Sequence, residues 1–260
     1  MGGSFALALR RVRPGLELIG SDADPATLRE AVRRGMVSPG EPRKADLVVL
    51  AAPIGAMPEL LAHLGDRAGV VTDMASTKGR VMGWAAAAGV DLVGGHPMCG
   101  SEGAGIAAAD PAIFEGAPWV LTRDDPVVSE LVRAVGARPC FMDAGTHDRL
   151  VAGVSHAAFL VSAAYVLALS SGGDWEEMKQ VAGPGFRDMS RLAAGNPELY
   201  ADIVSTNREE VLRSLAAVES SLAKLRRHVE AGDGRLVELL EEAKLARDIW
   251  EGKAARAGHD

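Results

Sequence analysis

The sequence feature that most constrains the fold is a series of short apolar runs that alternate with helical segments and stop near residue 144. Continuous apolar runs are typical of strands buried on both faces of a parallel sheet, with helices packed above and below. The order therefore predicts an α/β domain with a doubly wound parallel sheet over residues 1–143. The runs are LELIGSD (16–22), ADLVVLAAP (45–53), GVVTDMA (69–75), VDLVGG (90–95), PWVLTR (118–123) and RPCFMD (138–143).

From residue 144 to residue 260 the pattern has helical period throughout, which predicts a second, all-helical domain. We expect helices over 147–169, 197–230 and 235–252, with shorter helical segments between the first two. The first of these helices is apolar on nearly every side. A small bundle cannot bury such a helix alone, so we expect it to lie between two subunits of a homodimer.

Composition excludes several classes of protein. With 260 residues, 48% hydrophobic content and a formal charge of -7, the chain is a folded globular protein and not an electrostatic nucleic-acid binder. Cys99 and Cys140 are too few for a disulfide framework and lack metal-ligand spacing, which favours a reducing, cytoplasmic location and no metal site. No signal peptide is recognisable. The uncharged stretch 150–173 contains several polar residues, so we interpret it as a buried helix and not a membrane span.

The N-terminus carries part of a dinucleotide-binding pattern. Such a pattern places three glycines between a strand and a helix, and an acidic residue about 20 positions later to bind the ribose hydroxyls. Gly2 fits the third glycine, Gly3 follows it, and Asp22 ends the next strand. The Asp22 carboxylate would repel the extra phosphate of NADP, so we predict NAD, with Pro53 also at the cofactor. The alternative is that Gly2, Gly3 and Ser4 only cap a helix.

The strand and the two glycines that precede the third glycine in this pattern do not occur in the chain. Three explanations remain open: the recorded start lies downstream of the true one, the chain has been shortened, or part of the pyrophosphate cradle has been lost. We favour a misplaced start.

The glycine-rich segment GGHPMCGSEGAG (94–105) follows a predicted strand and carries His96, Ser101 and Glu102. Loops at the carboxyl ends of parallel strands are where such sheets bind ligands. His96 is therefore a candidate base, and Ser101 and Glu102 are candidate substrate contacts. A structural histidine bonded to a carbonyl is the alternative for His96.

Four segments occur in an order that resembles the prephenate/arogenate dehydrogenase family of tyrosine biosynthesis. The resemblance implies a Rossmann-like domain, a helical dimerisation domain and NAD(P)-dependent oxidative decarboxylation of prephenate to 4-hydroxyphenylpyruvate. The segments are DMASTK (73–78), GGHPMCGSEGAG (94–105), HDRLVAGVSH (147–156) and GFRDMSRLAAGNPELYADIVSTN (185–207).

The resemblance also implies roles for individual residues. His96 is similar to the family's catalytic histidine, which accepts the proton of the ring hydroxyl, and Ser76 to the serine that bonds the same hydroxyl. Arg191 matches the arginine that binds a substrate carboxylate. Alternatives remain for two of them: Ser76 as a helix N-cap, and Arg191 in an exposed ion pair with Asp188.

Other residues of these segments have more modest expected roles. We interpret Asp148, beside His147, as a structural residue at the positive end of the long helix, and His156 as a helix-core residue. Glu102 is a gate or a partner of the substrate-contacting residues. Phe159 stands where many relatives have a second histidine, which leaves prephenate and arogenate both open as substrates.

Two other functions are alternatives. The first is a 3-hydroxyacid-type dehydrogenase of the same plan, which usually uses a lysine of the helical domain. Lys179 is a lysine of the helical region, but the residues around it do not match the motif of those enzymes, which disfavours that activity. The second is a dimeric pseudoenzyme without cofactor binding. The chain offers no room for a separate regulatory domain, so we expect a stand-alone catalytic unit.

Overall fold

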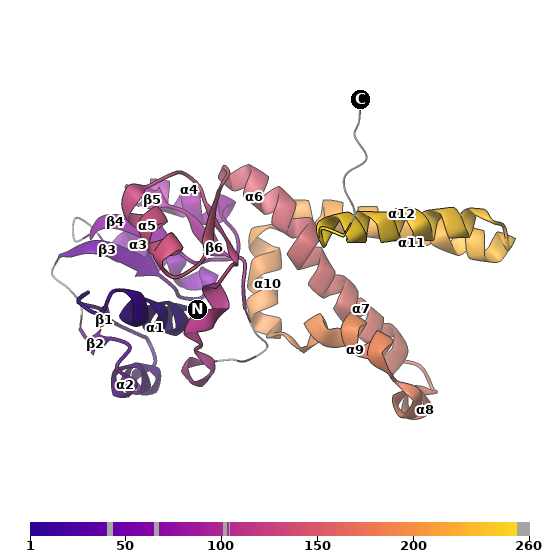
Figure 1. The fold of residues 1–260 in the computed structure, drawn as a ribbon, viewed down its shortest axis with the longest axis horizontal. Helices are drawn as coiled ribbons and strands as arrows, with labels where there is room; N and C mark the ends of the chain where they lie inside the picture. Colours follow the sequence, from indigo (N-terminus) through magenta and orange to yellow (C-terminus); the bar gives the residue numbers. More distant parts are fainter. Residues whose placement is uncertain (41–43, 65–67, 101–102, 104, 254–260) are drawn as a thin grey trace. The chain divides into compact units, whose positions relative to one another are not determined.

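The computed structural model describes residues 1–40, 44–64, 68–100, 103 and 105–253 (Figure 1). The chain divides into two compact units, Met1–Val211 and Leu212–Asp260. The first unit contains the strands and most of the helices. The second contains the larger part of α11 (Arg208–Ala231) and all of α12 (Arg235–Trp250), joined through Gly232 with φ of 61°.

The first part of the chain alternates strands and helices, as predicted. The strands are β1 (Ile19–Gly20), β2 (Ser38–Pro39), β3 (Ala45–Leu50), β4 (Ala68–Asp73), β5 (Leu92–Val93), β6 (Gly95–Pro97), β7 (Pro118–Leu121) and β8 (Arg138–Phe141). The α-helices between them are α1 (Gly2–Val12), α2 (Pro25–Arg33), α3 (Met57–Leu64), α4 (Gly79–Ala87) and α5 (Pro126–Ala134), and the short 3₁₀ turns are Ile54–Ala56, Ile106–Ala108 and Pro111–Phe114.

Within the described residues, the strands form three sheets. β1 pairs with β2, β4 lies between β3 and β5, and β7 lies between β6 and β8. All pairs are parallel except β6–β7. The exception arises because Gly94 bonds through its N–H and its carbonyl to Thr122, just beyond β7, and so directs β6 along β7 in the opposite sense. The prediction of a parallel-sheet α/β domain followed by helices is confirmed.

Several helices begin with the same two-residue signal, an acidic or amide side chain followed by proline. The Asp24 carboxylate accepts from the N–H groups of Ala26 and Thr27, and Asp125 and Asn196 cap their helices in the same way. Proline at the first helical position has no N–H that would need a partner. These caps fix the start of α2, α5 and α10 (Pro197–Thr206) from local sequence alone.

An aromatic cluster joins α1 to the strands beneath it. Phe5 of α1 packs edge-on against Trp119 of β7 at 5.3 Å between ring centroids, and Phe114 stacks on Trp119 at the same distance. All three side chains are buried. Burial of a large side chain contributes about 1.5–3 kcal/mol, so this cluster anchors α1 and β7 to each other.

The helical region starts with one long apolar helix made of α6 (Ala144–Val151), a π-helical turn (Ala152–Ala157) and α7 (Ala158–Ser170). By length and composition this helix could cross a membrane, and 33% of its most apolar window is buried in the chain. Three buried polar residues, His147, Asp148 and His156, lie along it and bond to other elements. A core helix of a soluble protein meets the same length criterion, and these contacts fit that alternative better.

Shorter helices follow: α8 (Trp175–Val181), α9 (Pro184–Ser190), a 3₁₀ turn (Arg191–Ala194) and α10. The continuous helix expected over 197–230 is wrong in one respect, because it is interrupted at Asn207, where φ is -130°. The Asn207 side chain is turned toward the long helix and donates to the carbonyl of Asp148 at 2.8 Å. This tertiary contact explains the interruption.

Candidate active site

The turn after β4 holds a buried ion pair. The Nζ of Lys78 donates to the carboxylate of Asp73, and both side chains are fully buried. Burial lowers the pKa of Lys78, and the neighbouring Asp73 and Asp148 carboxylates oppose that shift. Removing one partner of such a pair leaves an uncompensated buried charge, so each residue needs the other.

Asp73 also positions the strand that carries His96. Its carboxylate accepts the N–H of Gly95 at 2.9 Å and the N–H of Ala75 at 2.9 Å, which ties the end of β4 to the start of β6. A Cβ on Gly95 would lie 2.4 Å from the carbonyl oxygen of Asp73, so only glycine fits at this approach. His96 follows directly and is buried, with 8% of its surface exposed.

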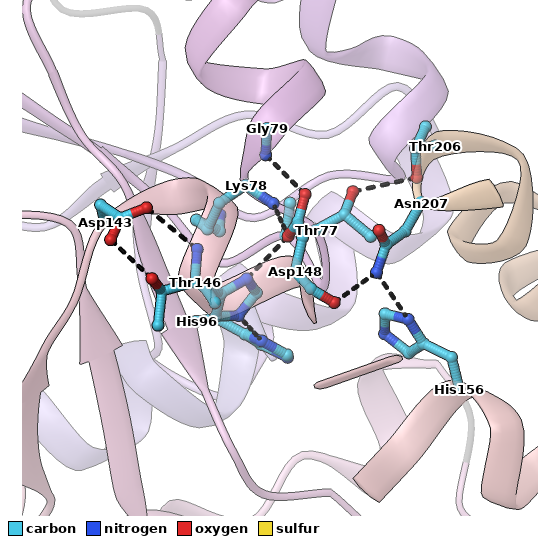
Figure 2. A network of polar contacts seen from close by, with 12 residues as sticks. Thr77, Lys78, Gly79, His96, Asp143, Thr146, Asp148, His156, Thr206 and Asn207 are labelled. Atoms are coloured by element: carbon cyan, nitrogen blue, oxygen red, sulfur yellow. Dashed lines mark hydrogen bonds and ion pairs between the residues drawn. The ribbon is translucent and has the colours of Figure 1, made fainter. Parts of the chain in front are cut away.

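Figure 2 shows a chain of polar contacts from His96 to the long helix. The Nδ1 of His96 lies 2.8 Å from the Nε2 of His147, and the Nδ1 of His147 lies 2.8 Å from the Oδ1 of Asp148. His147 is fully buried and Asp148 nearly so. Strand β6 and helix α6 thus place three titratable side chains in one hydrogen-bonded line.

The proton positions in this line follow from the Asp148 carboxylate, because an ionised carboxylate can only accept. His147 therefore donates through Nδ1–H, which leaves its Nε2 as an acceptor. His96 must then donate through Nδ1–H, and the lone pair of a neutral His96 is on Nε2. The arrangement leaves His96 with a free basic nitrogen, as general-base catalysis requires.

The same surroundings keep His96 neutral. Burial lowers the pKa of His96 well below its usual 6.5, and positive charge on His147, Lys78 or His156 adds to this shift. The pKa of Asp148 is lowered despite burial, because His147 and the N–H groups of Lys78 and Gly79 donate to its carboxylate. The neutral base His96 is therefore linked to the ionised carboxylate of Asp148 through the ring of His147.

Asp148 has a second role that differs from the expected one. It accepts from the N–H of Lys78 at 2.7 Å and of Gly79 at 2.8 Å, so it caps the start of α4 and not its own helix (Figure 2). The start of α6 is capped instead by Asp143, which accepts from Thr146. Asp148 is thus structural, as predicted, and also part of the line of contacts that ends at His96.

His156 and Asn207 extend the network on its other side. The Nδ2 of Asn207 lies 3.3 Å from the Nδ1 of His156 and donates to the Asp148 carbonyl. His156 is 1% exposed, in the π-helical turn. Burial lowers the pKa of His156 to about 4.

A separate contact joins the Asp73–Lys78 turn to the end of α10. The Oγ1 of Thr77 lies 2.9 Å from the Oγ1 of Thr206, within hydrogen-bond distance.

Ser76 lies half-buried in the same turn as Asp73 and Lys78. Its alternative role as an N-cap is taken by Asp148, because α4 has no capping side chain of its own. Arg191 begins the 3₁₀ turn after α9. It is close enough to Tyr200 that its charge opposes the upward pKa shift that burial gives that phenol.

Phe159, which stands where many relatives have a histidine, stacks on Tyr200. The rings of Phe159 and Tyr200 are 3.5 Å apart between centroids and nearly parallel, at 8°. A Cβ on Gly195 would lie 3.0 Å from a ring carbon of each, so the stack depends on glycine there. Ser162 accepts from Ala193 and donates to the Met189 carbonyl, which holds the turn that carries Arg191 against α7.

Two of the predicted cofactor residues, Gly2 and Gly3, begin α1. Gly2 is its first residue, and a Cβ there would lie 3.0 Å from the Cβ of Ala51, just after β3. Gly3 has still less room, 2.6 Å to Ile106. Pro53 follows β3 and Asp22 follows β1, and both are exposed. Ser101 and Glu102 lie outside the described residues, and within the described residues no cluster of three or more metal-ligating side chains occurs.

Comparison with known proteins identifies the family. Residues 5–139 match the family model described as prephenate dehydrogenase, nucleotide-binding domain, and residues 143–242 match prephenate dehydrogenase, dimerization domain. The chain belongs to the prephenate dehydrogenase family. The resemblance stated from the sequence is confirmed, and with it the assignment to a family of oxidoreductases.

Named relatives agree with this membership. The chain is 30% identical to prephenate dehydrogenase of Bacillus subtilis, over 98% of this chain and 74% of the relative. It is 29% identical to the Lactococcus lactis prephenate dehydrogenase, over 96% of this chain and 75% of that protein. A cyclohexadienyl dehydrogenase of Zymomonas mobilis is 29% identical over 79% of the chain and 75% of its own length.

Solved structures of the family have the same fold. Prephenate dehydrogenase of Aquifex aeolicus, in complex with hydroxyphenyl propionate and NAD+, superposes with a TM-score of 0.87 at 29% identity, covering 95% of this chain and 93% of that one. Arogenate dehydrogenase of Synechocystis superposes with a TM-score of 0.81 at 30% identity, covering 95% of each chain. The prephenate dehydrogenase fold thus includes the helical region.

The sequence analysis assigned no role in the site to several residues of the network, among them Asp73, Lys78, His147 and Asn207. Asp73 and Lys78 stood inside the DMASTK segment, where a buried acid and base five positions apart were a usable signal. His147 and Asn207 gave no such signal. Their function depends on contacts across 51 residues in both cases, to His96 and to His156.

Proposed function

We propose that this chain catalyses the NAD-dependent oxidative decarboxylation of prephenate to 4-hydroxyphenylpyruvate. The observation that carries the proposal is the His96–His147–Asp148 line, which leaves a neutral imidazole with a free Nε2. Family membership supports the reaction class. We further propose that residues 1–143 form the dinucleotide-binding domain and residues 144–260 the helical substrate and dimerisation domain.

The reaction requires one base at the ring hydroxyl. Hydride leaves the hydroxyl-bearing ring carbon for NAD, the hydroxyl proton passes to His96 Nε2, and the bond to the ring carboxylate breaks to release carbon dioxide. The electrons of that bond complete the aromatic ring, and the proton returns to the phenolate oxygen. Atoms and charge balance with no further reactant. Positive charge on His96 is stabilised through His147 by Asp148, a general-base role worth about a hundred- to ten-thousandfold in rate.

The substrate's other groups need their own partners. We assign Ser76, in the turn held by Asp73 and Lys78, to the same hydroxyl as His96, and Arg191 to a substrate carboxylate. We also propose that Ser101 and Glu102 contact the substrate. Because Phe159 offers no charge to the substrate side chain, arogenate is the substrate to test beside prephenate.

The residues at the start of α1 fit NAD. Gly2 and Gly3 let the helix N-terminus approach Ala51, just after β3, and Ile106, in the turn after β6, where a Cβ would be too close. A helix N-terminus favours a pyrophosphate. We assign Asp22 to the ribose hydroxyls and Pro53 to the wall of the site. NAD supplies the hydride acceptor. The Aquifex relative solved with NAD+ supports this cofactor.

We also propose a homodimer formed through the helical domain, working in the cytoplasm, where the free thiols of Cys99 and Cys140 stay reduced. The long helix leaves large apolar side chains exposed in the single chain, such as Val154 at 76% and Leu167 at 63%. Leu167→Glu should shift the mass measured by light scattering from dimer to monomer. Glu176→Ala, on an exposed polar position of α8, should leave it unchanged.

The activity test is the absorbance of NADH on mixing the chain with NAD and prephenate, with arogenate and with NADP in parallel. Turnover with prephenate and NAD is expected. His96→Asn should lower turnover by about a hundred- to ten-thousandfold while NAD affinity, measured by calorimetry, stays within about twofold. NAD binding without turnover on either substrate would contradict the proposed reaction.

A further inference from the structure

The π-helical turn Ala152–Ala157 presents a buried nitrogen that the proposed mechanism does not use. His156 is 1% exposed, its Nδ1 faces Asn207 at 3.3 Å, and its Nε2 has no hydrogen-bond partner among the described residues. Turns of this kind insert one extra residue into a helix and occur frequently at functional sites. The Nε2 of His156 therefore needs a hydrogen-bond partner that the chain itself does not supply among the described residues.

The neighbours of Asn207 decide which nitrogen of His156 carries the proton. Asn207 Nδ2 donates to the carbonyl of Asp148 at 2.8 Å, and a carbonyl can only accept, so this atom is the amide nitrogen and not the oxygen. The same Nδ2 therefore donates its second hydrogen to His156 Nδ1. The neutral His156 ring then carries its proton on Nε2, as an N–H donor.

This donor is costly unless something accepts from it. A buried N–H without a partner costs about 1–3 kcal/mol. The other orphaned nitrogen among the described residues, Nε1 of Trp119, lies in the aromatic cluster with Phe5 and Phe114. His156 has a different setting, because it is close enough to His96 for its charge to lower the pKa of that base. Figure 2 shows His96 and His156 at the two ends of one network, joined through Asp148 and Asn207.

We propose that the Nε2–H of His156 donates a hydrogen bond to an oxygen of the substrate, a carboxylate or keto oxygen, and that Asn207 positions it by fixing the tautomer. This inference rests on the proposed function and adds a second substrate-contacting histidine to it. It replaces the expectation that His156 serves only the helix core. A neutral donor suits this place, since a charged one would further weaken His96 as a base.

The variant test compares two amides that imitate the two ring nitrogens. The side-chain nitrogen of glutamine reaches the position of histidine Nε2, and that of asparagine the position of Nδ1. His156→Gln should keep the Michaelis constant for prephenate within about threefold, whereas His156→Asn should raise it about ten- to hundredfold with kcat changed less than about tenfold. The control is His63→Asn, an exposed histidine on α3, which should change neither constant.

Nitrogen-15 spectra of histidine-labelled chain give a readout that does not depend on turnover. At pH 7, Nδ1 of His156 should resonate as an unprotonated nitrogen and Nε2 as a protonated one. With NAD present, the product analogue hydroxyphenyl propionate should move the His156 Nε2–H signal downfield.

Three results would overturn the inference and leave the proposed function standing. One is a proton on Nδ1 of His156 in the free chain, and another is an unchanged Michaelis constant for His156→Asn. The third is an analogue that shifts the His96 signals and leaves those of His156 in place. If the analogue shifts neither histidine, the proposed function fails and this inference fails with it.

Discussion

Replacing Asp148 by asparagine is the change that tests most of the structure at once. The Asp148 carboxylate accepts three hydrogen bonds, from the N–H groups of Lys78 and Gly79 that start α4 and from the Nδ1–H of His147. Asparagine has nearly the same shape but one acceptor oxygen and an NH2 group. At least one donor therefore loses its partner, and the tautomer of His147 is no longer determined.

The size of the effect follows from these contacts. A hydrogen bond to a charged group contributes about 1.5–3 kcal/mol, and Asp148 is buried, so Asp148→Asn should lower the free energy of unfolding by about 2–4 kcal/mol. Turnover should fall further than stability explains, by about a hundred- to ten-thousandfold, because His96 loses its oriented acceptor. Because folding lowers the pKa of this carboxyl, its stabilisation is present above the unfolded value near 4 and is lost as pH falls below it.

Urea unfolding and steady-state kinetics measure the two effects separately. The matched control is Asp143→Asn, because Asp143 also caps a helix and accepts from Thr146 at 2.9 Å, but it lies at the surface and outside the line to His96. That variant should lose little stability and keep full turnover. Equal turnover of Asp148→Asn and wild type, or equal losses in the two variants, would refute the role assigned to Asp148.

Two further perturbations test the site. Because the pKa of His96 is held well below 6.5 and the neutral ring is the active form, kcat/KM should be constant from about pH 7 to 8 and fall only on the acid side; an inflection above pH 7 would contradict this. Gly195→Ala should strain the Phe159–Tyr200 stack and lower the free energy of unfolding by about 1–3 kcal/mol, whereas Gly173→Ala, with open space around it, should not; equal melting temperatures for the two variants would show the stack to be adaptable.

Much of the fold was predictable because its signals are local. The runs at 45–53, 69–75 and 118–123 became β3, β4 and β7, and Asp–Pro pairs marked helix starts. The antiparallel direction of β6 was not predictable, since it depends on the bonds between Gly94 and Thr122. Nor was the interruption at Asn207, where a contact with another helix overrides a helical pattern.

The sequence by itself determined the alternation of strands and helices, the apolar long helix, the family and the choice of His96 as the candidate base, because periodicity and motifs are properties of neighbouring residues. Only the tertiary structure decided which residues surround that base. His147 and Asp148 are separated from His96 by a strand, a helix and a further strand, and Asn207 lies beyond several more helices. The tautomers of His96, His147 and His156 depend on distances between such segments, and those distances exist only after the sheet and the long helix have packed together.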